Sequence, residues 1–374
     1  MKNTLLLLAL TLGAVPLHAE TLPPWAANNP SGHKVRIAVS APSGDKHAHL
    51  SWPKVITTAR GTVILGYSAG IGHNIGGSAL AVSLSKDGGR TFSAPNKLIA
   101  FPDDDPRYRD CGNLALGLAG DGSVLLLAMA YNRDEGNHIF GWRSTNDGVT
   151  WTRTDTSALG PNKTGSVFGN ILHLPGQGLA VFGHYRNGSQ PYRQGLWMSL
   201  SRDDGRRWGE ARRIADIHAV EPVVVSSAGR LVGFFRGDSQ GARGRQSIGV
   251  SDDQGATWRT ELSVLDAQEP AHARLAAPFA VDNPNKPGEL LVLTTERAMP
   301  GNTPGRIWLW RGEAKALNWQ RERVLLEFPM IEADRNTDFG YPWLLHVEGR
   351  RWLMFYYHGD SRGNCPLWVT EVML

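Results

Sequence analysis

The sequence predicts an all-β fold, a six-bladed β-propeller whose blades are sheets of four antiparallel strands. Three observations predict it: an octad of residues that recurs at regular intervals, six copies of a strand, glycine turn and strand unit, and the composition. The chain of 374 residues holds 43 Gly, 22 Pro and 13 Trp, and 20% of its residues are charged. Such a composition favours many short strands over helices.

The octad has the pattern Ser-x-Asp-x-Gly-x-Thr-Trp. Its four copies span residues 85–92, 144–151, 201–208 and 251–258. The last copy fits fully, and each of the others departs at one position, with Phe92 for Trp, Asn146 for Asp and Arg207 for Thr. A worn copy starts near Gly312 and ends at Trp319. The spacing leaves room for one four-stranded sheet per octad.

The octad has a local structural purpose. An Asp side chain accepts hydrogen bonds from the backbone N–H groups of its own turn, and Gly readily adopts positive φ. We therefore predict that each octad closes a β-hairpin at the edge of a blade and that its last aromatic residue packs between neighbouring sheets. Asp87, Asp203 and Asp253 then hold turns and take no part in chemistry.

A strand, a glycine turn and a second strand recur six times along the chain. The copies span residues 53–65, 114–126, 171–182, 222–232, 278–292 and 342–354. Their apolar runs are continuous, as expected for inner strands that neighbouring blades cover on both faces. Six copies predict six blades. The strand-like segments 34–39 and 367–370 are expected to complete one blade and so close the ring.

The N-terminus predicts export. Lys2 precedes an apolar run from Leu5 to Val15, and the small residue Ala19 precedes Glu20. This pattern is typical of a secretory signal peptide, and the run is too short for the ~20 residues of a membrane-spanning helix. We expect residues 1–19 to be removed and residues 20–374 to form a single propeller domain, secreted or periplasmic, with no membrane span.

The charge and cysteine content limit the possible partners. The net charge is only +4 and no dense basic run occurs, which argues against nucleic acid. The two cysteines, Cys111 and Cys365, form one disulfide bond or remain as two buried free thiols. No Cys and His cluster has metal-ligand spacing. We expect a monomer without a metal or other cofactor.

The residues that precede proline at the start of the inner strands are candidates for the central funnel. Proline belongs at the first position of a strand, which supports this alignment of the repeats. The residues in question include Trp52, Glu221 and Tyr341. A phenol is a weak nucleophile until an adjacent carboxylate accepts its proton, and Glu221 and Tyr341 supply such a pair.

These features resemble the sialidase superfamily, in which the octads are called Asp boxes. The resemblance implies that Tyr341 is the nucleophile, that Glu221 activates it, and that Arg236 and Arg306 hold the carboxylate of an acidic sugar through their guanidinium groups. It also implies a glycan or acidic sugar as the substrate.

The chain departs from the superfamily pattern at two positions. An Arg-Ile-Pro expected before the first blade is Ser51-Trp52-Pro53, and the loop 70–77, where the acid/base Asp is expected, holds no carboxylate. His73 in this loop is the candidate proton carrier. The candidate catalytic residues are therefore Tyr341, Glu221 and His73. The candidate substrate-binding residues are Arg236, Arg306, Trp52, His184, Arg186 and His358.

Three functions fit this set of residues. The first is an exo-acting glycoside hydrolase on an acidic or otherwise unusual sugar. The second is a polysaccharide lyase on the same propeller, with His73 or His184 and a tyrosine as proton carriers. The third is a carbohydrate-binding propeller without catalysis. The fold alone does not separate them, because one propeller hosts many functions.

Overall fold

The structure is a computed structural model. It describes residues 23–27, 34–73, 75–132, 136–161, 163–186, 189–237, 246–262, 276, 278–297, 305–328 and 337–374. The predicted signal peptide, residues 1–19, and the predicted start of the mature chain at Glu20 lie outside the described residues. Within the described ranges, no helix is both long enough and apolar enough to cross a membrane.

Strands dominate the described part of the chain, and the helical elements there are α1 (Pro24–Ala27) and the short 3-10 helix η1 (Ser157–Leu159). Four sheets have four strands each, with antiparallel neighbours. They are β2 (His49–Thr57), β3 (Val63–Gly70), β4 (Ala79–Ser85) and β5 (Asn96–Ala100); β14 (Ala219–Ser227), β15 (Arg230–Gly237), β16 (Gln246–Ser251) and β17 (Arg259–Leu262); β18 (Phe279–Asp282), β19 (Glu289–Glu296), β20 (Gly305–Glu313) and β21 (Gln320–Phe328); and β22 (Thr337–Glu348), β23 (Arg351–Asp360), β24 (Leu367–Met373) and β1 (Val35–Val39).

The fifth sheet has eight strands and corrects the prediction of six separate blades. Its strands are β6 (Asp110–Leu118), β7 (Val124–Tyr131), β8 (His138–Ser144), β9 (Thr152–Thr154), β10 (Ser166–Leu174), β11 (Gly178–His184), β12 (Leu196–Ser201) and β13 (Arg212–Ala215). Two antiparallel four-strand units are joined where β6 and β10 pair in parallel, with Gly169 opposite Ala115 and Asn170 opposite Leu116. Gly117 of β6 lies so close to β10 that a Cβ there would be 2.6 Å from the Cβ of Ile171, so the absence of a side chain lets these inner strands approach closely.

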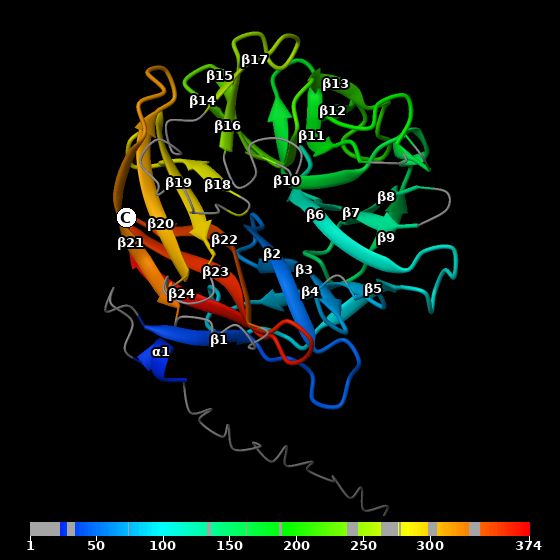
Figure 1. The fold of residues 1–374 in the computed structure, drawn as a ribbon, viewed down its shortest axis with the longest axis vertical. Coiled ribbons are helices and arrows are strands. Elements are labelled where there is room, and N and C mark those ends of the chain that lie inside the picture. The colour runs from blue at the N-terminus through cyan, green and yellow to red at the C-terminus, as the bar shows by residue number, and fades with distance from the viewer. Residues whose placement is uncertain are drawn as a thin grey trace, which may run out of the picture.

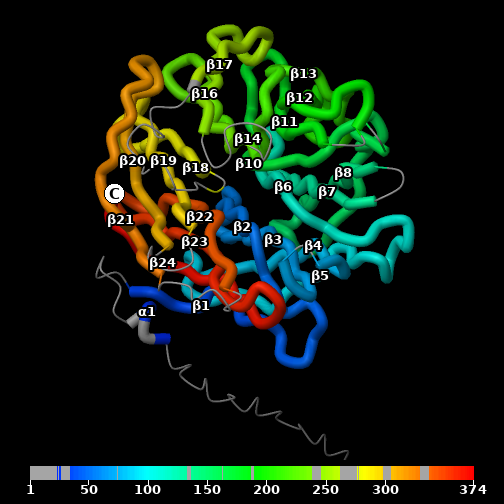
Figure 2. Tube along the Cα trace, viewed as in Figure 1, coloured from blue at the N-terminus to red at the C-terminus, as the bar shows by residue number. Residues whose placement is uncertain are grey.

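The sheets form a ring around a common centre (Figure 1). All six predicted inner hairpins are present, and the first strand of each unit contacts the first strand of the next, from β2 through β6, β10, β14, β18 and β22 back to β2. The predicted closure is confirmed, because β1 pairs with β24 as the outermost strand of the last sheet. The chain trace follows the same ring, with blue β1 beside red β24 (Figure 2).

Each octad forms the turn between the third and fourth strands of its unit, as predicted. In the octad of Asp87, the Ser85 hydroxyl donates to the carboxylate at 2.7 Å and the Thr91 N–H donates to it at 2.9 Å. Gly205 in the third octad shows why glycine is needed, since a Cβ there would lie 2.4 Å from Leu125 of the neighbouring unit. The last aromatic, Trp208, is buried among the side chains between these two units.

The core fills the space between adjacent units with aromatic and aliphatic side chains, divided into four clusters. Trp197, Trp310 and Trp352 are among its largest fully buried members. Cys111 and Cys365 are both buried and free, so the alternative of two free thiols is the one that the structure has.

Candidate active site

A shared irregularity at the start of the inner strands creates the site. Trp52 in β2, Glu221 in β14 and Tyr341 in β22 have φ angles of 56°, 54° and 52°, and the pairing register of each strand shifts at that point. Left-handed backbone costs about 1–3 kcal/mol for a residue with a Cβ, and such strain tends to concentrate at functional sites. The three residues therefore stand at equivalent bulges around the axis, as their shared position before proline predicted.

Glu221 and Tyr341 form a direct pair at the centre of the ring. The Tyr341 hydroxyl donates a hydrogen bond of 2.6 Å to Oε1 of Glu221. Nη1 of Arg236 donates to Oε2 of Glu221 at 2.9 Å and to the hydroxyl oxygen of Tyr341 at 3.2 Å. The predicted hydrogen bond is present, and Arg236 lies beside it as expected.

The electrostatics of the pair fix its protonation. Burial raises the pKa of Glu221, but the charge of Arg236 and the hydrogen bonds from Tyr341 and Arg236 outweigh burial and lower this pKa to about 2. Burial and the nearby Glu221 charge raise the pKa of Tyr341 above its ordinary value. At neutral pH the Glu221 carboxylate is therefore charged and the Tyr341 phenol is protonated. The phenol proton lies in the hydrogen bond to Glu221, the group that can accept it.

Three arginines occupy equivalent positions around the pair. Arg186 follows β11, Arg236 stands near the end of β15, and Arg297 follows β19. The guanidinium carbon of Arg297 lies 6.0 Å from the centre of the Tyr341 ring. Arg186 is close enough to Glu221 for the charge of this carboxylate to act on it. The ends of the second strands thus gather three guanidinium groups on one side of the axis.

The prediction for Arg306 is corrected by its contacts. Its Nε donates to Glu327 at 3.0 Å, its Nη1 lies 3.8 Å from Glu296, and among the described residues no bond joins it to Glu221 or Tyr341. Arg306 is the second residue of β20, the third strand of its sheet, whereas Arg297 directly follows β19, the second strand. Arg297 takes the expected place, and its position after the second strand, matching that of Arg236, was the available signal.

A buried carboxylate that sequence reasoning missed lies next to His73. Nδ1 of His73 lies 2.5 Å from Oδ2 of Asp338. Arg297 and the Tyr357 hydroxyl donate to Oδ1 of Asp338 at 3.3 and 3.1 Å. Burial raises the pKa of Asp338, but the imidazoles of His49 and His73 and the charge of Arg297 outweigh it and hold this pKa well below its usual range. Asp338 lies three residues before Tyr341 on β22. This short spacing along one strand could have identified Asp338 as a candidate site residue from the sequence.

Trp52 and His184 flank the pair in different ways. The Trp52 ring lies 5.5 Å from His73 and 6.3 Å from Tyr341, so it connects the two predicted catalytic groups. His184 is fully buried, and its Nδ1 accepts the backbone N–H of Glu221 at 3.2 Å. The side chain of His184 therefore supports the Glu221 bulge. Because it is fully buried, it does not fit the predicted role in substrate binding.

His358 is not part of the site. Its ring stacks on Phe328 at 5.0 Å between centres and lies 4.5 Å from the Trp25 ring of α1. Successive side chains of a strand point to opposite faces, so Tyr357 faces Asp338 while His358 faces the outer aromatic cluster. Burial lowers the pKa of His358 to about 4, which keeps it neutral.

Lys54 is a second buried charge-bearing group that sequence reasoning missed. Its Nζ lies 4.1 Å from the Phe168 ring centre, 4.2 Å from that of Trp343 and 5.9 Å from that of Tyr341. Burial lowers the pKa of Lys54 to about 7, although the Glu221 charge opposes the change. The amine thus sits in an aromatic cage below the Tyr341 ring.

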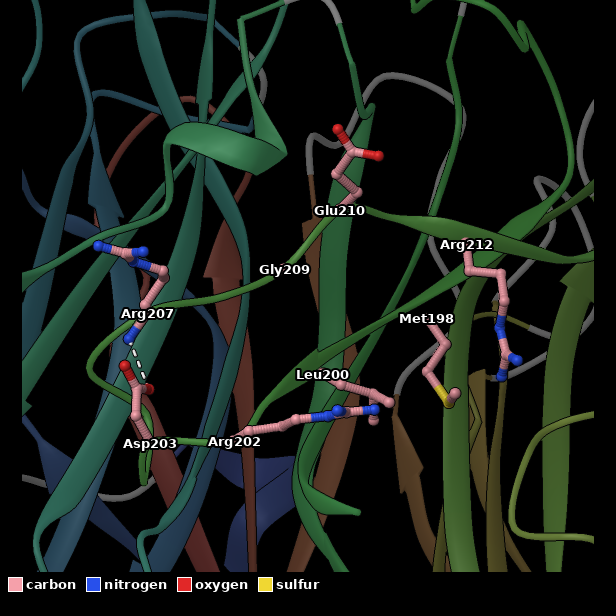
Figure 3. Close-up of a pocket in the computed structure, with 8 residues that line it drawn as sticks. All are labelled: Met198, Leu200, Arg202, Asp203, Arg207, Gly209, Glu210 and Arg212. Carbon is pink, nitrogen blue, oxygen red and sulfur yellow. Dashed lines mark hydrogen bonds between the residues drawn. The ribbon is translucent and has the colours of Figure 1, made fainter.

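A separate groove of about 490 Å³ lies at the outer edge of the third unit (Figure 3). Its lining includes Met198 and Leu200 of β12, the octad residues Arg202, Asp203 and Arg207, and the following Gly209, Glu210 and Arg212. None of these belongs to the central cluster. Among the described residues, no group of three or more His, Cys, Asp or Glu side chains is arranged to hold a metal ion.

Comparisons with known proteins agree with this geometry. The chain matches the family described as the BNR repeat-like domain over residues 103–353. Its fold is similar to that of a Hadza microbial sialidase, with a TM-score of 0.67 and 16% identity, covering 91% of this chain and 68% of the other. No curated protein matches the sequence.

Two fungal enzymes share the fold over nearly their whole length. The α-L-arabinofuranosidase of Fusarium graminearum has a TM-score of 0.64 and 15% identity, covering 91% of this chain and 97% of the other. The α-L-arabinanase of Penicillium chrysogenum has a TM-score of 0.62 and 17% identity, with the same two coverages. The ring of antiparallel sheets around a central cluster is therefore a sialidase-like propeller. The chain belongs to the BNR repeat-like domain family, which confirms the resemblance drawn from its repeats.

Proposed function

We propose that this protein is an exported, exo-acting glycoside hydrolase that attacks an acidic or otherwise unusual sugar with Tyr341 as the nucleophile. The observation that carries the proposal is the 2.6 Å hydrogen bond from the Tyr341 hydroxyl to the ionised, buried Glu221. A phenol becomes an effective nucleophile when an adjacent carboxylate takes its proton, and tyrosine nucleophiles are known among glycosidases of the sialidase type.

In the first step the Tyr341 oxygen attacks the anomeric carbon and passes its proton to Glu221. The glycosidic C–O bond breaks, and its electron pair stays with the leaving oxygen, which takes a proton from Nε2 of protonated His73. The products are a glycosylated Tyr341 and the released alcohol. Arg236, which touches both members of the pair, offsets the negative charge of Glu221 before this transfer.

In the second step water attacks the anomeric carbon and gives its proton to Nε2 of His73. The bond from the sugar to Tyr341 breaks, and the phenol oxygen recovers the proton held by Glu221. The two steps together restore every group and retain the anomeric configuration, as a double displacement does.

The charges around the pair favour an anionic sugar. Of the three arginines, Arg236 is paired with Glu221 and Arg297 with Asp338, whereas Arg186 forms no salt bridge with a carboxylate among the described residues. Planar guanidinium groups match carboxylate geometry, so Arg186 favours a substrate with an acidic group. Structural neighbours named as a sialidase and as arabinan-degrading enzymes support a glycan substrate in general.

A turnover assay tests the proposal. The purified protein is incubated with a panel of aryl glycosides of acidic and neutral sugars, and release of the phenol is followed. Tyr341→Phe should abolish turnover and leave ligand binding largely unchanged, because only the nucleophilic oxygen is removed. Tyr356→Phe is the matched control, since this buried tyrosine bonds Thr370 away from the pair. Full turnover in Tyr341→Phe would disprove the nucleophile.

A polysaccharide lyase is the second candidate, favoured by the histidine on the loop where a carboxylic acid was expected. A lyase would leave an unsaturated product that absorbs ultraviolet light, so acidic polysaccharides incubated with the protein distinguish the two reactions. Binding of the same polysaccharides without either product would indicate a carbohydrate-binding propeller.

Export is a separate part of the proposal and rests on the N-terminal sequence. Protein recovered outside the cytoplasm should begin near Glu20 by mass spectrometry. An intact N-terminus from Met1 on exported protein would contradict it.

A further inference from the structure

We propose that Asp338 is a positioning residue that holds the His73 imidazole with Nδ1 toward the protein interior and Nε2 toward the funnel, where it exchanges a proton with the leaving group. The inference rests on the proposed hydrolase. It explains how a chain whose 70–77 loop lacks a carboxylate can still protonate a leaving oxygen.

Both carboxylate oxygens of Asp338 are surrounded by protein groups. Oδ2 lies 2.5 Å from Nδ1 of His73 and 3.3 Å from Nε2 of His49. Oδ1 accepts from Arg297 at 3.3 Å and from Tyr357 at 3.1 Å. A carboxylate surrounded by donors on both oxygens stays ionised, and its lowered pKa agrees with this.

An ionised carboxylate accepts hydrogen bonds and donates none. The proton in the 2.5 Å contact therefore belongs to Nδ1 of His73, and the neutral ring must keep Nε2 bare as an acceptor. When His73 gains a proton, it gains it at Nε2, and the charge of Asp338 stabilises the imidazolium. This is the orienting function that a buried acid performs for a catalytic histidine.

Exposure decides which member of the cluster meets the substrate. The side chain of His73 is 27% exposed, against 4% for Asp338 and 1% for His49. The only one of these rings open to the funnel is thus His73, and Trp52 packs edge-on between it and Tyr341. The proton carrier and the nucleophile face the same space from two neighbouring units.

The backbone around His73 is anchored as well. Its N–H donates to the carbonyl of Ser361 at 2.7 Å, across the gap to the β23–β24 loop. The preceding Gly72 packs so closely that a Cβ would lie 2.6 Å from the same carbonyl. Main chain and imidazole are therefore both held by the last sheet, through Ser361 and Asp338, which fixes the ring without the flexibility of an exposed loop.

Asp110 is the competing acid at this end of the funnel. Burial raises the pKa of Asp110, although Ser78 and the Cys111 N–H donate hydrogen bonds to its carboxylate. Asp110 is partly exposed, whereas Asp338 is buried, so Asp110 competes with His73 for the role of proton donor. The experiment must separate the two.

Leaving-group dependence tests the positioning role. Loss of acid catalysis slows glycosides with poor leaving groups and spares those that need no protonation. We expect Asp338→Asn and His73→Gln each to lower kcat/KM, which reports the first step, about 10²-fold for an alkyl glycoside and to leave kcat/KM for a dinitrophenyl glycoside within about 3-fold of wild type. Tyr356→Phe, which removes a buried hydroxyl bonded to Thr370 and leaves Asp338 and His73 in place, should change neither value more than about 3-fold.

Two outcomes of this assay would overturn the proposal. Equal loss for both classes of glycoside in Asp338→Asn would make Asp338 merely structural. An Asp110→Asn variant with the leaving-group dependence expected of His73→Gln, together with a normal His73→Gln, would assign the proton to Asp110.

A measurement without substrate separates this proposal from the hydrolase itself. In protein labelled with ¹⁵N histidine, the ring signals of His73, assigned by their loss in His73→Gln, should show a protonated Nδ1 and a bare Nε2 in the neutral form. Asp338→Asn should shift the ring toward the other tautomer. Wild-type protein with Nε2 protonated and Nδ1 bare would overturn the proposal, even if Asp338→Asn does not fold. Correct tautomers in a protein with no hydrolase activity would leave the positioning intact and reject the proposed function.

Discussion

Two kinds of carboxylate in this molecule reach the same ionisation by different means. Asp253 in an octad is fully exposed, and its pKa is lowered to about 2 by hydrogen bonds from Thr257 and Ser251, all within four residues. Glu221 is buried, and its pKa is also lowered to about 2, by partners 15 and 120 residues away.

The comparison teaches that a lowered pKa does not mark a functional site by itself. The octad carboxylates are satisfied by their own turn, and solvent screens them, so their loss affects one hairpin. The funnel carboxylates are satisfied only when the ring is closed, so their loss leaves the half-buried Arg236 and Arg297 without their charged partners. Substitutions in the two regions should therefore differ in kind, and the following experiments test that difference.

The largest effect is expected for Glu221→Gln. Turnover should fall at least about 10³-fold, because the phenol of Tyr341 loses its proton acceptor. Stability should fall by about 1–3 kcal/mol, since the half-buried Arg236 loses the charged partner of its hydrogen bond. Assays of kcat and urea unfolding measure the two. Asp253→Asn is the matched control and should leave turnover unchanged; equal losses in both variants would remove the distinction between the regions.

The pH dependence of the Glu221 effect has a defined sign. Its pKa is 4.5 as the ordinary value and about 2 in the folded protein, so its contribution to stability is full above about pH 4.5 and is lost as pH falls toward 2. The stability gap between wild type and Glu221→Gln should close over this window in acid urea titrations. A gap that is constant from pH 6 to pH 2 would show that folding does not lower the pKa of Glu221.

Lys54→Met should stabilise the protein at neutral pH. The pKa of Lys54 falls from 10.5 to about 7 on folding, so between these values the unfolded chain binds a proton that the folded chain does not. Wild type therefore loses stability as pH falls from 10 to 7, and the variant should exceed it by a few kcal/mol at pH 7 but not at pH 10. Urea unfolding at both values measures the gap. A destabilised variant at pH 7 would indicate that the ammonium is held by interactions stronger than its burial cost.

Arg297→Ala and Arg306→Ala compare the corrected and the predicted substrate arginine. Arg297 lies between Asp338 and the Tyr341 ring, so Arg297→Ala should lower kcat/KM for an acidic glycoside about 10²-fold. Arg306 is paired with Glu327, so Arg306→Ala should change kcat/KM less than about 3-fold. A larger loss in Arg306→Ala than in Arg297→Ala would restore Arg306 as the substrate arginine.

The smallest effect is expected for Asp203→Ala in the third octad. Its hydrogen bonds to Ser201 and Arg207 hold a single exposed turn, so turnover should stay within about 2-fold of wild type and thermal unfolding should shift only slightly. A large loss of turnover would mean that this octad, beside the groove of Figure 3, acts on the funnel.

Repetition made much of this molecule predictable. The octads, the six inner hairpins and the ring closure follow from short patterns, because a turn or a hairpin is stabilised by residues close in sequence. Glu221, Tyr341, Arg236 and Trp52 could be placed for the same reason: each occupies a fixed position in a repeat, and repeats around one axis bring equivalent positions together.

Other features depended on contacts between repeats. Asp338, Lys54 and Arg297 gained their surroundings only when units distant in the chain met, and Arg306 and His358 were misplaced because their neighbours across the sheet decide where they point. The merging of β6 with β10 likewise depends on how closely two inner strands approach. By itself the sequence determined the repeating unit and the position in each unit from which the funnel residues come. Both depend on local hydrogen bonds and on the alternation of side chains along a strand. Only the tertiary structure decided which charges are paired at the axis, because burial and long-range partners exist only in the closed ring.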